Sequence, residues 1–91
     1  MESDLEMGYD QSMEQSLRKR VTMIPGLCGG RPTIRGMRIR VVDILDYMAG
    51  GETRDSLLAE FKELEDDDIT AALYFASEVL SQPTNVIEAA E

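Results

Sequence analysis

The stretch GLCGGRPTIRGMRIRVVDIL, residues 26–45, decides the fold of this chain. It places four glycines and four arginines among short apolar residues, and its pattern then turns helical. Glycine and proline punctuate the first part and predict turns around a short strand at 33–35. Apolar and β-branched residues at 21–24 predict a second short strand. We therefore expect residues 21–40 to form a small β element, a hairpin.

Three helices are predicted after this β element. Their expected bounds are about 41–50, 53–62 and 66–81. Gly50-Gly51 is typical of a helix end, and Thr53 is a suitable N-cap for the second helix. The acids at 65–68 favour the N-terminus of the third helix, and Pro83 marks its end. The second and third helices are joined by a short turn, an outline compatible with a helix-turn-helix.

The predicted fold class is therefore mainly α, with a short N-terminal hairpin followed by a three-helix bundle. Residues 21–82 form the single predicted domain. Residues 1–20 are read as an acidic, mobile arm, with a short helix over 10–20 as the alternative for part of it. Residues 83–91 are read as a C-terminal tail. A chain of 91 residues buries only about 60% of its unfolded surface, so we expect a homodimer.

The charges of the chain are segregated along its length. Net charge is −9 at pH 7, yet residues 18–40 carry seven bases and no acid. Residues 1–17 carry five acids, and residues 41–91 carry thirteen acids and two bases. An acidic chain lacks general affinity for nucleic acid or anionic membranes. The segregation predicts either a surface that meets a charged partner or internal pairing of the two signs.

Cysteine and histidine usage narrows the expected setting and chemistry. The single Cys28 has no partner for a disulfide within the chain, which favours the reducing cytoplasm. The chain has no histidine, and its glycine pair fits neither a P-loop nor a dinucleotide fingerprint. No apolar run approaches the ~20 residues that span a bilayer. We expect a protein that is not an enzyme and needs no metal, cofactor, small-molecule substrate or membrane.

Residues 30–41 carry a regularly spaced run, Gly-x-Pro-x-Ile-x-Gly-x-Arg-Ile-x-Val. Its members are Gly30, Pro32, Ile34, Gly36, Arg38, Ile39 and Val41. With a glycine after the first helix and Asp68-Ile69 at the head of the last, the run resembles the domain-of-unknown-function family 433 (DUF433) of small prokaryotic proteins. The resemblance covers roughly residues 21–80.

The resemblance implies a homeodomain-like three-helix fold with an N-terminal β element, often dimeric. It also implies the role of an antitoxin that binds a PIN-like ribonuclease toxin. Two positions depart from the family pattern. Met37 stands where threonine is common, and Glu65 stands where a threonine or serine cap is usual. Because glutamate is a poorer cap, we expect the N-cap of the third helix to shift to Asp66.

The candidate contact residues are the hairpin arginines, Arg31, Arg35, Arg38 and Arg40. One interpretation is a solvent-facing basic strip that contacts nucleic-acid phosphates or a partner protein. The other is that these side chains pair with the eighteen acids of the protein, within or across subunits. Arg38 has a further interpretation as a structural anchor that holds the hairpin to a helix C-terminus or a carboxylate.

The third predicted helix carries the candidate recognition face of a helix-turn-helix. Its polar, uncharged members are Thr70, Tyr74 and Ser77, and the helix begins with the acids at 65–68. No Arg or Lys lies on this face, and the acids repel phosphates, which argues against major-groove reading by this helix. The leading hypothesis is an antitoxin-like binding protein that contacts a toxin and operator DNA. The alternative is a DNA-binding transcriptional regulator without a toxin.

Overall fold

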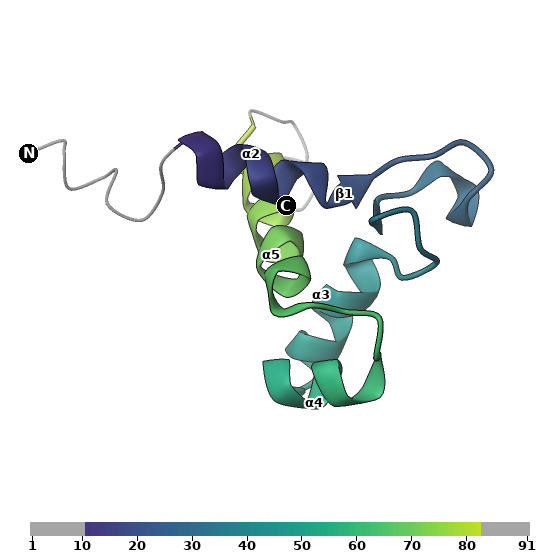
Figure 1. Cartoon of the computed structure of the whole chain (residues 1–91), viewed down its shortest axis with the longest axis vertical. Coiled ribbons are helices and arrows are strands. Elements are labelled where there is room, and N and C mark those ends of the chain that lie inside the picture. Colours follow the sequence, from purple (N-terminus) through teal and green to yellow (C-terminus); the bar gives the residue numbers. More distant parts are fainter. Residues whose placement is uncertain (1–10, 83–91) are drawn as a thin grey trace, which may run out of the picture.

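A computed structural model describes residues 11–82 of the chain (Figure 1). In chain order its elements are helix α2 (Gln11–Lys19), strand β1 (Val21–Thr22), the 3₁₀ turn η1 (Cys28–Gly30), strand β2 (Thr33–Ile34), and helices α3 (Val41–Ala49), α4 (Arg54–Glu60) and α5 (Asp66–Leu80). The predicted fold class is confirmed: the chain is mainly helical, with a short antiparallel hairpin ahead of three helices. Each predicted helix bound lies within two residues of the observed one.

The hairpin is small and leads straight into α3. Strands β1 and β2 run antiparallel, with Val21 opposite Ile34 and Thr22 opposite Thr33. The hydroxyls of the two threonines lie 2.9 Å apart and share a hydrogen bond. On the far side of β2, Thr33 forms an antiparallel bridge with Arg40, the N-cap of α3. Because strands this short are marginal by themselves, the sheet depends on the helices packed beside it.

Glycine ends α3 in a Schellman motif. The Gly51 N–H donates to the Met48 carbonyl at 3.0 Å, and the Glu52 N–H donates to the Tyr47 carbonyl at 3.0 Å. This pair of hydrogen bonds requires a residue with left-handed backbone conformation after the helix, and Gly51 has φ +105°. The predicted helix end at the glycine pair is confirmed, with Gly51 as the residue that needs glycine.

Both following helices begin with reciprocal caps. The Ser56 N–H donates to Thr53 Oγ1 at 3.1 Å, and the Thr53 N–H donates to Ser56 Oγ at 3.0 Å, which confirms the predicted cap of α4. Helix α5 has Glu65 as its N-cap residue. The expected shift of the cap to Asp66 is wrong. The carboxylate of Asp68, three residues after the cap, accepts the Glu65 N–H at 2.8 Å and forms the second half of the capping box of α5.

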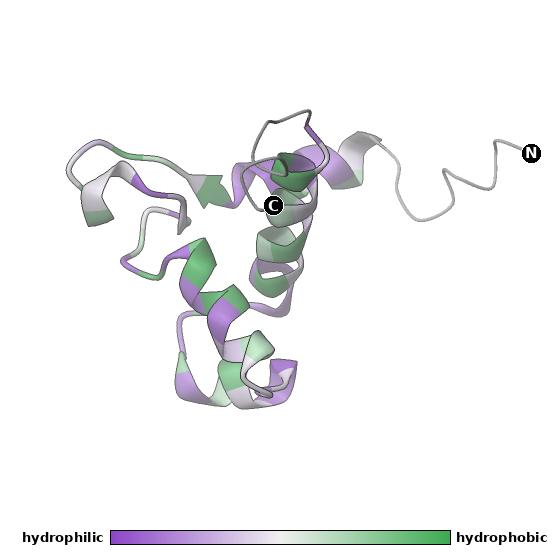
Figure 2. Cartoon of the chain, turned by 180° about the vertical axis from the view of Figure 1, so that it is seen from behind, coloured by the Kyte–Doolittle hydropathy of each residue, from purple (hydrophilic) through white to green (hydrophobic). Residues whose placement is uncertain are grey.

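The hydrophobic core joins the hairpin to all three C-terminal helices. Its buried members are Ile34, Val41, Ile44, Leu57, Leu64, Ile69 and Ala72. Leu64 enters the core from the turn between α4 and α5. Figure 2 shows hydrophobic residues along α3, α5 and β1, and mainly hydrophilic residues along α2.

Helix α2 belongs to the folded structure. It crosses α5 (Figure 1), and Leu17 is buried between the two helices. The predicted mobile arm therefore does not reach residue 20, and the alternative of a short helix near 10–20 describes this segment correctly. Residues 1–10 and the predicted tail at 83–91 lie outside the described residues. No helix within residues 11–82 is long and apolar enough to cross a membrane.

Candidate functional site in the basic segment

The acid Asp68 gathers the basic segment around itself. Its carboxylate is fully buried at the first turn of α5 and accepts hydrogen bonds from Arg20 Nη1 at 2.9 Å and Arg35 Nη2 at 2.7 Å. Arg35 Nε adds bonds of 3.0 and 3.2 Å to the two carboxylate oxygens. Together with the Glu65 N–H, these donors satisfy a buried charge that would otherwise be costly. The cluster links α2, the hairpin and α5.

A tight turn aims Arg35 at this carboxylate. The Met37 N–H donates to the Ile34 carbonyl at 2.8 Å, and the two central residues have positive φ, +47° at Arg35 and +71° at Gly36. Positive φ at both positions is the signature of a type I′ turn, which glycine supports at the second position. Arg35 Nη2 also donates to the Glu63 carbonyl at 2.7 Å. Backbone strain at a non-glycine residue is thus offset by four hydrogen bonds of its guanidinium.

The protonation equilibria of the cluster follow from its contacts. Burial by itself would raise the pKa of Asp68, but hydrogen bonds from Arg35, from the Glu65 N–H and from Arg20 outweigh burial and lower that pKa below its usual range. Hydrogen bonding to Asp68 raises the pKa of Arg35, and hydrogen bonds to Glu65 and then Asp68 raise the pKa of Arg20. The three groups therefore stay charged across the physiological range.

The remaining hairpin arginines do not contact Asp68 as Arg35 does. Arg40 forms a two-pronged ion pair with Asp43 one turn into α3, at 2.8 and 3.0 Å. Arg31 and Arg38 are exposed, and their side chains make no hydrogen bond or ion pair within residues 11–82. The anchoring role that we considered for Arg38 falls to Arg35. The four candidate residues therefore do not form one strip, since two face the protein's own acids and two face solvent.

The candidate recognition face on α5 is largely engaged by other side chains. Thr70 accepts a hydrogen bond from Arg54 Nη2 at 3.0 Å. The Tyr74 ring lies under the guanidinium of Arg18, 5.7 Å from its centroid, and Arg18 also pairs with Glu78. Ser77 alone of the three is exposed. Because α2 crosses this side of α5, the face is not open along its length.

The acids at the start of α5 also form ion pairs within the protein. Glu65 pairs with Arg20 at 2.8 Å, and Asp66 pairs with Arg54 at 2.9 Å. Within the described part of the chain, no group of three or more acid or cysteine side chains is placed to hold a metal ion. The first turn of α5 is thus a polar junction between elements of the fold.

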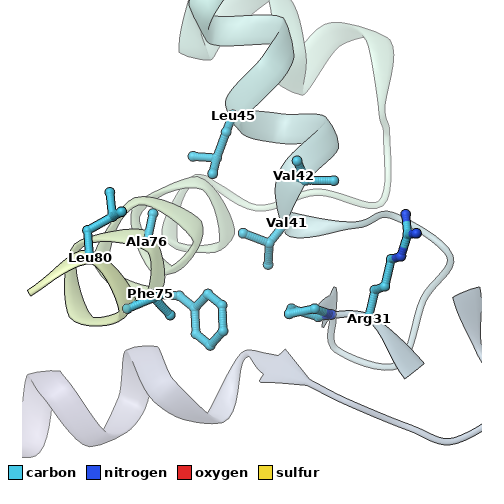
Figure 3. A pocket seen from close by; sticks show the side chains of 9 residues that line it. Arg31, Val41, Val42, Leu45, Phe75, Ala76 and Leu80 are labelled. Carbon is cyan, nitrogen blue, oxygen red and sulfur yellow. The ribbon is translucent and has the colours of Figure 1, made fainter. Parts of the chain in front are cut away.

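An apolar groove lies between α3 and α5, at the end of α5 away from Asp68 (Figure 3). Its volume is about 420 Å³. Val42 and Leu45 line it from α3, and Phe75 and Val79 line it from α5, while Arg31 lies at the end of the groove opposite Leu80. The sequence gives no sign that the apolar side chains in the last turn of α5, Val79 and Leu80, stay exposed among the residues that the structure describes.

Sequence reasoning missed Asp68 as the centre of the site. We assigned it to the acidic first turn of α5 and to the Asp-Ile pair of the family pattern, and we gave it no contact with the arginines. The available signal was its place beside Ile69 in the family pattern. Because Ile69 points into the core, the side chain of its neighbour on the helix has a defined direction. It missed Val42 and Phe75 as groove residues because exposure of an apolar side chain depends on which elements lie nearby.

Together, the fold and its ion cluster define a class of protein: a small helical module whose N-terminal hairpin is locked onto the first turn of its last helix. Residues 21–76 match the family described as "Protein of unknown function (DUF433)", and the chain belongs to this family. The match confirms the resemblance drawn from residues 30–41. It spans the hairpin, α3, α4 and most of α5, and it excludes α2 and the last turn of α5.

A solved structure agrees with this assignment. The chain is similar to a DUF433 member protein from Anabaena variabilis ATCC 29413, with 30% sequence identity and a TM-score of 0.64. The similarity covers 84% of this chain and 71% of that one. No curated protein matches the chain.

Proposed function

We propose that this protein is a non-enzymatic, antitoxin-like binding module that holds a PIN-like ribonuclease toxin. The observation that carries the proposal is that most arginine side chains of the protein pair with its own carboxylates. Five of the seven arginines pair with the protein's own carboxylates. This inward pairing leaves little free positive charge for phosphates and leaves acids facing solvent. Such a surface favours a basic protein partner over nucleic acid.

A set of acids on α4 and beside it offers the contact surface. Asp55, Glu60 and Glu63 are exposed, and their carboxylates make no ion pair within residues 11–82. We name these three residues the α4 acids. A ribonuclease presents basic side chains along the path of its RNA, so the α4 acids would complement that path and compete with the substrate. Family resemblance supports the choice of a PIN-like enzyme as partner.

Co-expression with the product of the neighbouring gene tests the proposal. We expect a complex that copurifies and that restores growth when the ribonuclease alone is toxic. The triple variant Asp55→Asn, Glu60→Gln, Glu63→Gln should bind at least tenfold more weakly, because it removes three facing charges. Absence of both the complex and the growth rescue with the unaltered protein would refute the antitoxin role.

A matched control separates the α4 acids from net charge. The triple variant Ser12→Lys, Gln15→Lys, Ser16→Lys changes the net charge by the same amount on exposed positions of α2. It should bind the ribonuclease as the unaltered protein does. Equal loss in both variants would mean that total charge, and not the α4 surface, governs association.

Operator DNA is the second candidate ligand, and Arg31 and Arg38 are the observation in its favour. Both are exposed and unpaired in the described part of the chain. Two phosphate contacts predict a slope of about −2 in log K against log salt. The double variant Arg31→Ala, Arg38→Ala should flatten that slope. A chain that shifts no DNA at low salt would rule this candidate out, together with the alternative of a regulator without a toxin.

A homodimer remains part of the proposal because the core is small and the two strands are short. Exposed Met23 and Ile24, just after β1, offer an apolar contact for a second copy. Sedimentation equilibrium at micromolar concentration measures the assembly directly. A species of monomer mass alone would overturn the expectation.

A further inference from the structure

The groove between α3 and α5 exposes more apolar surface than isolated side chains would. Val42 is 44% exposed, Val79 48% and Leu80 80%, and all three border the same hollow. Single exposed apolar residues are common on protein surfaces, whereas several that border one hollow give the kind of lining that binding grooves have. The fold does not require this exposure, because the buried core forms elsewhere, around Ile44 and Ile69.

The shape of the groove selects its occupant. It is concave, so two copies of it cannot fill one another across a twofold axis, since a self-complementary interface needs a ridge as well as a hollow. The lining residues of α5 run from Phe75 to Leu80, a rise of about 7.5 Å. That length matches one or two turns of a helix laid between α3 and α5, with apolar anchors three or four residues apart.

The charge at the end of the groove adds a second requirement. Arg31 lines the groove and has no acid partner within residues 11–82. Its position opposite Leu80 (Figure 3) places a cation at one end of an otherwise apolar surface. The Arg31 guanidinium is exposed, and a carboxylate on an occupant of the groove can bind it with two parallel hydrogen bonds.

We propose that this groove binds a short amphipathic helix of a partner protein, with apolar side chains at i, i+3 or i+4, and i+7 and a carboxylate that pairs with Arg31. The contact is separate from the α4 acids. The identity of the partner rests on the proposed function, and that partner would contact both the α4 acids and the groove. The chemistry of binding to the groove does not depend on which protein supplies the helix.

Fluorescence anisotropy with designed peptides tests the proposal on the full chain. The probe is a labelled, helix-forming peptide of about fifteen residues with leucines at i, i+3 and i+7 and a glutamate one turn beyond. Its matched control carries lysine in place of that glutamate. We expect the glutamate peptide to bind at least tenfold more tightly than the lysine peptide. Arg31→Glu should reverse this preference.

Variants at exposed positions locate the bound peptide. Val79→Asp should reduce binding at least tenfold with little effect on folding, because the side chain is half exposed. Met13→Asp is the control, since Met13 on α2 is 47% exposed and does not line the groove, and it should bind the peptide normally. Binding that is indifferent to both Val79→Asp and Arg31→Glu, or no binding at millimolar peptide, would overturn the proposal.

Two other occupants would also overturn it. If Val79→Asp changes the mass measured by sedimentation, the groove is a contact between copies of this chain. If the peptide binds only after Val86 and Ile87 are both replaced by Asp, the chain's own residues 83–91 occupy the groove. Because the peptides require no ribonuclease, their failure leaves the α4 acids untouched. Failure of the co-expression experiment likewise leaves the peptide result standing.

Discussion

The two ends of α5 do opposite things with the same helix. At its N-terminus, Asp68 is fully buried and is held by two arginines and a backbone N–H. At its C-terminus, Val79 and Leu80 expose apolar side chains beside an open groove. The polar end is buried and the apolar end is exposed, which is the reverse of what hydrophobicity alone predicts. We call them the closed end and the open end of α5. The comparison teaches that the buried charge serves the fold, whereas the exposed apolar surface is where we propose that a partner helix binds.

Helix electrostatics explains why the charged end is the closed one. The first turn of α5 has free N–H groups and a positive dipole, which favour a carboxylate there. Asp68 also attracts the guanidinium groups of Arg20 and Arg35, so one acid joins three elements that the short strands could not hold together. The last turn of α5 carries no basic residue of its own, and its Glu78 pairs with Arg18 of α2 while Val79 and Leu80 stay exposed.

The largest effect is expected at Asp68. Asp68→Ala should lower the free energy of unfolding by about 3 kcal/mol, because breaking a buried ion pair leaves its partners without compensation. The estimate sits at the low end of that range since Arg20 and Arg35 can regain water, being 22% and 34% exposed. Urea denaturation followed by circular dichroism measures the change, because the chain lacks tryptophan.

Asp67→Ala is the matched control for this prediction. Asp67 is the preceding acid, 67% exposed, and it only approaches Arg20 at 3.7 Å. Its replacement should change stability by less than about 0.5 kcal/mol. Similar losses for Asp67→Ala and Asp68→Ala would show that the closed end of α5 is held by general charge and not by the buried carboxylate.

A smaller loss is expected at Arg35. Arg35→Ala should cost about 1–2 kcal/mol, since hydrogen bonds to a charged group are lost on a side chain that is partly solvated. Arg35→Lys keeps the charge but not the planar fork, so it should restore only part of the stability. Arg38→Ala should have no measurable effect in the same denaturation experiment, because the Arg38 side chain is exposed and makes no hydrogen bond or ion pair within residues 11–82. An Arg38→Ala loss equal to that of Arg35→Ala would contradict the assignment of the anchor to Arg35.

The closed end of α5 also predicts how stability depends on pH. Because the folded-state pKa of Asp68 lies below the unfolded value of about 3.9, its contribution is present above that value and is lost as pH falls through the folded pKa. Unfolding measured from pH 6 down to pH 2 should show a steeper fall for the unaltered protein than for Asp68→Asn. Parallel curves for the two proteins would assign acid denaturation to other carboxylates.

Local signals in the sequence predict much of the fold. Periodicity places α3, α4 and α5, the glycine pair ends α3, and Thr53 caps α4, because each signal depends on residues within one turn. The ion cluster is different in kind. Arg35 and Asp68 are 33 residues apart, and a chain with eighteen acids gives no rule for choosing which of them an arginine meets. Only the three-dimensional arrangement makes that choice.

The same limit applies to α2 and to the groove. Leu17 is a single buried apolar residue in a polar helix, so residues 11–19 contain too few apolar side chains to predict that α2 packs on α5. For α5, the sequence does not predict burial residue by residue, since Leu73 is 39% exposed and Ala71 is buried. It also cannot predict how far along the helix a neighbour extends, and Leu80 in the last turn is 80% exposed.

The smallest effect on stability is expected at the open end of α5, where Leu80 is 80% exposed. Leu80→Gln keeps a good helix former and removes little buried surface, so the free energy of unfolding should change by less than about 0.5 kcal/mol. Binding of the glutamate peptide should nonetheless fall severalfold, since Leu80 lines the groove. A variant that loses stability and keeps peptide binding would invert the comparison and make this end of α5 part of the fold. The expected outcome, weak binding on an undisturbed fold, is what distinguishes a recognition surface from a core.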